Sequence, residues 1–330
     1  MSQQKEKTIL KDSLIDVPGI KVGHSQNTKA GTGCTVILCE KGAVGGVDIR
    51  GGAPGTRETD LLSPINLVEK IHAIYLTGGS AFGLDGASGV MKYLEEKGVG
   101  FDVGITKVPI VPGAVLFDLD VGDYRIRPDA QMGYEACLNA SETEIAQGNV
   151  GAGTGATVGK ILGRSRSMKG GLGTASFKAQ ELVVSAIVVV NCLGDIVDPE
   201  SGEMIAGVLA EDKKSIVGTM SFLTHFPQKT KDSFPQNTTL GVIATNACLT
   251  KAGATKVASM AQDGLARTIN PAHTMFDGDT IFCVATVEVE AGVNVVGSIA
   301  AEVIARAIVK AIKNTRSLYG LPSYKDLAKK

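Results

Sequence analysis

The sequence predicts an α/β protein in which helices cover layered sheets. Its 330 residues are 44% hydrophobic, which is enough to bury a sizeable core. Apolar, β-branched segments alternate with helical ones, which is typical of a Rossmann-like parallel sheet. However, the spacing is irregular, and the expected strands cluster in pairs with helices before and after them. A layered α-β-β-α sandwich fits this pattern at least as well, and periodicity alone leaves both architectures open.

The first third of the chain predicts paired strands followed by helices. Apolar runs between turn residues predict short strands at 34–39 and 43–50, and a buried strand at 73–76. Ser63 is a potential cap with proline after it at the first helical position, so we expect a helix to begin there. Its apolar face would carry Leu67, Val68 and Ile71. A second helix is expected over 83–96, closed by a glycine.

The middle third predicts more loops. A strand at 99–103 and a segment at 108–111 precede a helix from about residue 128 to 139. Residues 148–157 contain too many glycines for regular structure. The run 182–190 is almost continuously apolar and β-branched, as a strand covered on both faces should be. The more polar region 195–236 predicts loops with short elements.

The last third predicts a strand–helix–strand–helix order. Strands are expected at 238–245 and 280–289, and helices at 250–269 and 295–313. The apolar stripe of the last helix is Ile299, Val303, Ala307 and Ala311. The chain shows no low-complexity segment and no fixed-period repeat, so we expect residues 1–330 to form a single catalytic domain.

Composition excludes several classes of partner. The 33 basic and 34 acidic residues leave a net charge of -1, so no global field favours nucleic acid or an anionic membrane. Aromatic residues make up only 5%, too few for the stacking platforms of single-strand binders. We therefore expect a small-molecule substrate.

We expect a cytoplasmic protein, because the sequence shows neither a secretory signal nor a membrane span. The charged first 13 residues have no apolar core, and the longest apolar run is far short of the ~18–20 residues of a membrane span. The six cysteines form no C-x-x-C pair, so we expect buried free thiols rather than a disulfide framework or a zinc site.

Thr238 is the candidate nucleophile. The polar, turn-prone segment 234–237 leads to this threonine at the first position of an apolar strand. A threonine hydroxyl needs a neighbouring base, and its own α-amine can serve once the preceding peptide bond is cut. That amine titrates near ~7.7–8.0. The alternative is an ordinary threonine that opens a strand.

Two further polar sites stand at strand ends. Asp277 and Asp279 precede the strand at 280–289, where they could form a surface turn, a metal-binding pair or acid/base machinery near Thr238. Asn191 ends the apolar run 182–190, as a strand-end turn or as an oxyanion donor. The four histidines share no metal-ligand spacing, so we expect them to be structural and expect no metal.

The glycine-rich loop does not match the known phosphate-binding patterns in full. The Walker pattern fails at two positions around Gly159 and Lys160. The dinucleotide pattern G-x-G-x-x-A is met by Gly151, Gly153 and Ala156, but no buried strand precedes it. We therefore expect no nucleotide cofactor.

Six segments together resemble the L-aminopeptidase/D-esterase family, which includes D-stereospecific and β-peptidyl aminopeptidases. They lie in matching order along nearly the whole chain: DVPGIKVGH (16–24), GVDIRGGAPGTRETD (46–60), LTGGSAFGL (76–84), GNVGAGTG (148–155), GGLGTA (170–175) and ATNA (244–247). The resemblance implies an α-β-β-α sandwich similar to N-terminal-nucleophile hydrolases, with different strand connectivity. It also implies a self-cleaving precursor and a homo-oligomer, a tetramer of cleaved heterodimers.

Carried over by position, the resemblance puts the nucleophile at Thr238, the oxyanion asparagine at Asn191 and the acidic partner at Asp279, with Asp277 nearby. Cleavage between Asn237 and Thr238 would give chains 1–237 and 238–330. The expected activity is hydrolysis of small peptide, amide or ester bonds through an acyl-Thr intermediate. Many members of the family have Gly-Ser at the cut, and the extra methyl group of threonine could slow cleavage.

One departure from the family concerns recognition of the substrate amine. The family's aminopeptidases have a Glu and a Tyr just after the segment matching 108–111, whereas residues 112–118 here read PGAVLFD. Asp118 is the nearest substitute for the missing carboxylate. We therefore expect poor hydrolysis of N-terminal aminoacyl amides. The alternative function is a non-catalytic small-molecule-binding or scaffold protein that keeps the family fold.

Overall fold

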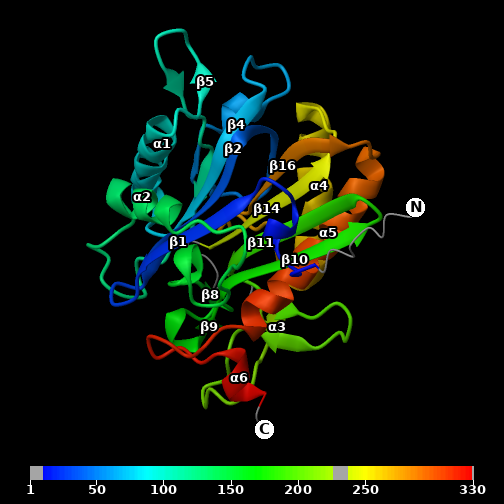
Figure 1. Ribbon diagram of the computed structural model, residues 1–330. Helices are drawn as coiled ribbons and strands as arrows, with labels where there is room; N and C mark the ends of the chain where they lie inside the picture. Colours follow the sequence, from blue (N-terminus) through cyan, green and yellow to red (C-terminus); the bar gives the residue numbers. More distant parts are fainter. Residues whose placement is uncertain (1–9, 226–236, 329–330) are drawn as a thin grey trace.

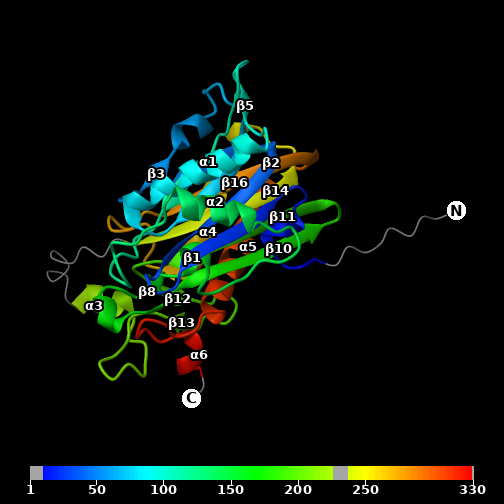
Figure 2. The ribbon, with the colours of Figure 1, turned by 60° about the vertical axis from the view of Figure 1, so that its left-hand side comes forward.

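The computed structural model describes residues 10–225 and 237–328, which form two layers of β-sheet between two pairs of helices (Figure 1). Figure 2 shows α1 and α2 on one outer side of the sheets and α4 and α5 on the other. No helix within these residues is both long and apolar enough to cross a bilayer. The described helices are α1 (Gly86–Glu96), α2 (Ala130–Leu138), α3 (Thr219–His225), α4 (Lys251–Thr268), α5 (Val293–Lys313) and α6 (Tyr324–Leu327).

The strands differ widely in length. Among the described residues, nine strands have only two or three residues: β3 (Thr56–Arg57), β5 (Phe101–Asp102), β6 (Lys107–Val108), β7 (Gly113–Val115), β8 (Thr157–Val158), β9 (Met168–Lys169), β12 (Asp195–Val197), β13 (Met204–Ala206) and β15 (Ile269–Asn270). Strand β1 (Lys21–Asn27) is longer. The long strands are β2 (Thr32–Ile49), β4 (Lys70–Thr77), β10 (Gly171–Ala179), β11 (Leu182–Asn191), β14 (Thr238–Ala247) and β16 (Thr280–Val289).

Strand β2 connects the two layers. The hydrogen-bonded order is β10-β11-β14-β16-β2-β4-β7-β3, with β1 also paired to β2. The first half of β2 pairs with β1 and β4, and after an irregularity between Leu38 and Ala43 its second half pairs with β16. Strand β14 runs antiparallel to β11 and parallel to β16. It therefore lies inside the sheet, with a neighbour on each side.

Three apolar clusters fill the spaces between the four layers. One lies between α1/α2 and the β1-β2-β4 layer, one between the two sheets, and one under α4 and α5. Along β11, Val183, Ile187 and Val189 belong to the cluster between the sheets. Val184 and Val188 belong to the cluster under the helices. Both faces of β11 are thus covered, which explains its continuous apolar sequence. The predicted α-β-β-α sandwich is confirmed, and the Rossmann-like alternative is wrong.

The predicted helix at Ser63 is wrong. A short 3-10 turn, Thr59–Leu62, precedes it, and Ile71 lies in β4, paired with Ala43 of β2. Ile65 and Leu67 are 92% and 82% exposed, so no packed surface stabilises a helix there. The two strands predicted at 34–39 and 43–50 are one strand, β2, because pairing with β4 resumes after residues 40–42. All six cysteines are free, and all but Cys248 are buried, as predicted.

Candidate active site

The candidate site lies at the head of β14. Thr238 is the first residue of this strand and is only 4% exposed. Its Oγ1 donates to the carbonyl oxygen of Asn237 over 2.5 Å. Across the sheet Thr238 pairs with Asn191 at the end of β11, and Asn237 forms a parallel bridge with Asp277. The sheet order therefore brings together Thr238, Asn191 and the two aspartates that the sequence had singled out.

Asp279 holds two segments of the site together. Its Oδ1 accepts a hydrogen bond from the Thr239 main-chain N over 2.7 Å. Its Oδ2 accepts from the main-chain N of His273 and lies against His273 Nδ1, each at 3.0 Å. The carboxylate is 1% exposed. A fully bonded buried carboxylate of this kind is held in one position beside the strand head.

Asp277 is buried on the same turn. Its Oδ2 accepts from the Thr274 main-chain N over 3.0 Å and from Thr274 Oγ1 over 2.5 Å. Burial, and then the negative charge of Asp279, raise the pKa of the Asp277 carboxyl above its usual range. Two close carboxylates cannot both be charged without cost, and such pairs are typical of acid/base sites.

Asn191 is held by Lys160, which the sequence does not mark as a site residue. Its Nδ2 donates to the Phe117 carbonyl over 3.0 Å, and its Oδ1 accepts from Lys160 Nζ over 3.0 Å. Lys160 Nζ also donates to the Asn191 carbonyl over 2.9 Å. Burial lowers the pKa of Lys160 to about 8. The one signal in the sequence is the position of Lys160 directly after the glycine-rich loop, where it resembles the lysine of an incomplete Walker pattern.

A pocket of about 240 Å³ opens onto Thr238. Its lining is mostly small or apolar: Ala53, Pro54, Gly55, Ser80, Ala81, Val115, Leu116, Phe117 and Thr238. Asp118 is not among these residues. It is 2% exposed, its Oδ1 accepts from the Gly79 main-chain N over 2.7 Å, and burial raises its pKa to about 6. The structure thus brings the apolar segment that ends at Phe117 to the nucleophile, but not the Asp118 carboxylate.

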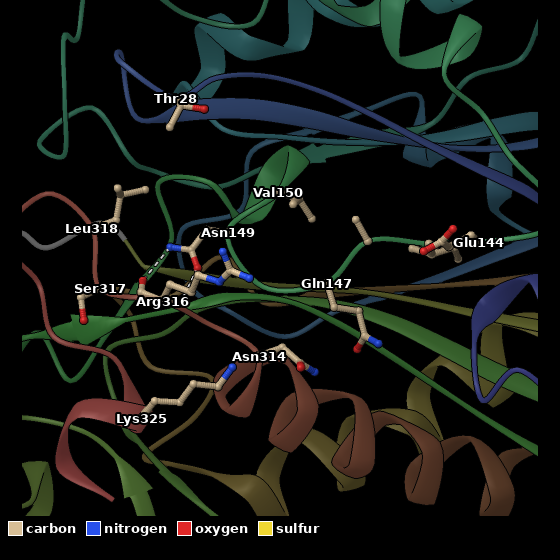
Figure 3. A pocket seen from close by; sticks show the side chains of 12 residues that line it. Thr28, Glu144, Gln147, Asn149, Val150, Asn314, Arg316, Ser317, Leu318 and Lys325 are labelled. Carbon is tan, nitrogen blue, oxygen red and sulfur yellow. Dashed lines mark hydrogen bonds between the residues drawn. The ribbon is translucent and has the colours of Figure 1, made fainter. Parts of the chain in front are cut away.

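A larger hollow of about 700 Å³ lies elsewhere, between the end of α5 and the loop around Asn149 (Figure 3). There the Arg316 main-chain N donates to Asn149 Oδ1 over 2.8 Å, and Asn149 Nδ2 donates to the Arg316 carbonyl over 3.0 Å. Its lining contains none of the candidate site residues. Size alone therefore does not identify the site.

The glycine-rich loop is used inside the protein. The Gly151 main-chain N donates to Gln26 Oε1 over 2.9 Å, and Gly153 N donates to the Val150 carbonyl over 2.8 Å. Because these two N–H groups already have partners inside the protein, they are not free to bind a phosphate. Within residues 10–225 and 237–328, no three His, Cys, Asp or Glu residues are grouped so that they could hold a metal ion.

A threonine at the head of an inner strand of an α-β-β-α sandwich, beside buried carboxylates and an amide, is the arrangement expected of a hydrolase of the N-terminal-nucleophile type. Residues 12–324 match the family model described as peptidase family S58. The chain belongs to this family and is a hydrolase of the aminopeptidase type. These findings give no support to the alternative of a non-catalytic binding or scaffold protein.

Individual relatives agree with the family, and a solved structure agrees with the fold. An uncharacterized aminopeptidase of Mycobacterium tuberculosis is 44% identical, over 96% of this chain and 98% of the relative. A 6-aminohexanoate-oligomer endohydrolase of Kocuria sp. is 30% identical, over 90% and 85% of the two chains. The solved L-aminopeptidase D-Ala-esterase/amidase of Ochrobactrum anthropi, a variant of the Ntn hydrolase fold, superposes with a TM-score of 0.70 at 17% identity, over 92% and 86%.

Proposed function

We propose that the chain cuts its own bond between Asn237 and Thr238 and that the new N-terminal Thr238 then hydrolyses small amide or ester substrates. One observation carries this proposal: the Thr238 hydroxyl lies 2.5 Å from the carbonyl oxygen of the residue before it, at the mouth of a pocket. A hydroxyl in that place is within reach of the carbonyl carbon of the same peptide bond. Cleavage would leave chains 1–237 and 238–330.

In the mature enzyme, Thr238 Oγ is the nucleophile and its α-amine is the base. Asp279, with Asp277 beside it, positions and charge-balances the ammonium form of that amine. Asn191 lies directly across the sheet and donates one of its amide hydrogens to the developing oxyanion. Its other amide hydrogen is held by the Phe117 carbonyl, which fixes the orientation of the amide.

The substrate proposal follows from the pocket. The pocket lining offers no carboxylate to pair a substrate ammonium, so an amide or ester without a charged amine next to the reacting carbonyl fits it best. The name of the Kocuria relative, an oligomer endohydrolase, describes cleavage within a chain, away from its free amine. Asp118 stays a candidate amine anchor only if its buried carboxylate, now bonded to the Gly79 main-chain N, becomes accessible from the pocket. We propose that the enzyme works as a homo-oligomer of cleaved chains.

Intact-mass analysis tests self-cleavage directly. We expect the wild-type protein to yield two chains that begin at residues 1 and 238, and Thr238→Ala to remain one chain of unchanged fold. Thr238→Ser is the matched control, because serine keeps the hydroxyl and should still be cut. A wild-type protein that stays whole while hydrolysing p-nitroanilides or esters would contradict the proposal.

A further inference from the structure

The carbonyl oxygen of Asn237, in the bond to be cut, accepts a second hydrogen bond besides that from the Thr238 hydroxyl. The Gly278 main-chain N donates to the Asn237 carbonyl oxygen over 2.7 Å. The Asn237 main-chain N in turn donates to the Phe276 carbonyl over 2.9 Å. These two bonds make a one-residue parallel bridge between Asn237 and Asp277. The reacting carbonyl is thereby fixed on the side of the Asp277–Asp279 turn.

This bond stands apart from the regular pairing of β14 with β16. That pairing begins at Leu240 opposite Thr280. Between the bridge and this point, the Thr239 main-chain N donates to the Asp279 side chain instead of to a main-chain carbonyl. The peptide bond before Thr238 is therefore held by the Gly278 main-chain N, outside the regular ladder. The Asp279 carboxylate lies between the two and interrupts the main-chain pairing.

Gly278 also makes room for the Thr238 hydroxyl, because it has no side chain. A Cβ atom at position 278 would lie 2.7 Å from Thr238 Oγ1 and 2.7 Å from the Ala53 carbonyl oxygen. Both distances are far below van der Waals contact. A side chain here would therefore displace either the hydroxyl or the pocket wall. The glycine between the two aspartates thus supplies an N–H while keeping the hydroxyl beside its target.

We propose that the Gly278 main-chain N–H is the oxyanion donor of self-cleavage. The inference rests on the proposed cut between Asn237 and Thr238. Thr238 Oγ forms a bond to the Asn237 carbonyl carbon, and the π pair of the C=O bond moves onto the oxygen that Gly278 already contacts. Hydrogen bonds to a charged acceptor are about twice as strong as neutral ones, so this donor stabilises the transition state more than the ground state.

The remaining steps balance without a cofactor. The oxyanion pair returns to the carbonyl, the carbon–nitrogen bond breaks, and the Thr238 nitrogen takes up the proton that the hydroxyl has lost. The product is an ester between the Asn237 carbonyl and Thr238 Oγ, with a free α-amine. Water then hydrolyses the ester, leaving the Asn237 carboxylate and restoring the Thr238 hydroxyl.

The donor is tested by replacing one N–H with oxygen. Cell-free translation of the full chain with glycolic acid at position 278 removes that N–H and adds no side chain. The matched control has glycolic acid at the exposed Gly292, where the surroundings are open. We expect cleavage to be ~10²–10³-fold slower at 278 than in the control, the usual loss for one oxyanion donor. Equal cleavage rates in the two folded proteins would overturn the proposal.

Two further measurements keep the test decisive. Gly278→Ala should slow cleavage strongly and Gly292→Ala should not, because only the first adds an atom next to Thr238 Oγ1. In uncut Thr238→Ala labelled with 15N-glycine, the Gly278 amide should exchange with solvent much more slowly than the Gly292 amide. Equally fast exchange would mean that the bond to Asn237 is absent, and the proposal would fail. If the wild type itself stayed whole, the proposed cleavage would fail first.

Discussion

His273 is a positioning residue for Asp279 in this structure. It lies against Asp279 Oδ2 with both its main-chain N and its Nδ1, and its φ of 57° is in the left-handed region. Asparagine tolerates that conformation and carries an amide that can donate to a carboxylate, whereas alanine offers no donor.

We therefore expect His273→Ala to lower kcat about tenfold or more with little change in KM, since a hydrogen bond to a charged group contributes roughly 1.5–3 kcal/mol. His273→Asn should retain most of the activity. Steady-state kinetics of the cleaved enzymes would measure both. Equal losses in the two variants would contradict a positioning role that a donor at residue 273 can fill.

Lys160 makes stability depend on pH in a defined direction. Burial lowers its folded-state pKa to about 8, from an ordinary value of 10.5. Between these two values the unfolded chain holds a proton that the folded chain has lost. The contribution of Lys160 to the free energy of unfolding therefore rises with pH over about 8 to 10.5.

The test compares urea unfolding of Thr238→Ala with that of Thr238→Ala/Lys160→Met at several pH values. The difference in unfolding free energy between the two should change across this window, because every other titrating group is common to both proteins. A difference that stays constant from pH 7.5 to 10.5 would show that Lys160 titrates normally.

At the scale of elements, α4 and α5 pack too closely for a side chain at Gly264. A Cβ there would lie 2.0 Å from the Ala301 carbonyl oxygen of α5. Gly253, in the first turn of α4, has ordinary contacts of 3.4 Å or more around the same position. Gly264→Ala should therefore destabilise by about 1–3 kcal/mol, and Gly253→Ala should be neutral or stabilise by up to ~1 kcal/mol. Thermal unfolding of the two uncut variants measures this, and equal melting temperatures would contradict it.

Elements with long periodic patterns could be predicted from the sequence. The expected helix at 295–313 corresponds to α5, and the strand expected at 280–289 to β16. Strand β10 was missed because its glycines lower strand propensity. In the fold, Gly173 of β10 lets α5 approach, since a Cβ there would lie 2.2 Å from the Ala307 carbonyl oxygen. The glycine at position 173 is therefore required by a contact with a distant segment, and the neighbouring sequence cannot predict that contact.

The candidate site, too, could be predicted from the sequence only in part. Thr238, Asn191 and Asp279 could be named because each stands at the end of an apolar strand. Their proximity depends on the order β11-β14-β16, which the sequence left open. The contacts of Lys160 with Asn191 span 31 residues, and the segment that carries Phe117 reaches the same amide from 74 residues away. No local pattern predicts such contacts.

At the scale of the whole molecule, self-cleavage would not separate the two chains. Strand β14 lies between β11 and β16, as Figure 1 shows. After the proposed cut, β14 and β16 would belong to the small chain and β11 to the large one. Helices α4 and α5 cover the same sheet, and Arg306 and Lys310 of α5 both pair with Asp12 of the large chain. We expect the cleaved chains to elute together in native gel filtration and to separate only in denaturant. Dissociation at moderate salt would show that surface charge, and not the shared core, holds them together.

Substrate choice also belongs to the whole molecule, because segments from four parts of the chain build the pocket. The loop at 53–55, the turn at 80–81, residues 115–117 and Thr238 leave apolar surface and no acidic side chain around the nucleophile. A substrate ammonium buried there would lose its hydration without gaining a partner, which costs several kcal/mol. We expect matched esters or anilides with an acylated amine to have at least tenfold higher kcat/KM than those with a free amine.

Asp118→Asn should leave this ratio unchanged, because the buried Asp118 carboxylate faces Gly79 rather than the pocket lining. A strong preference for the free amine that disappears in Asp118→Asn would instead make Asp118 the amine anchor.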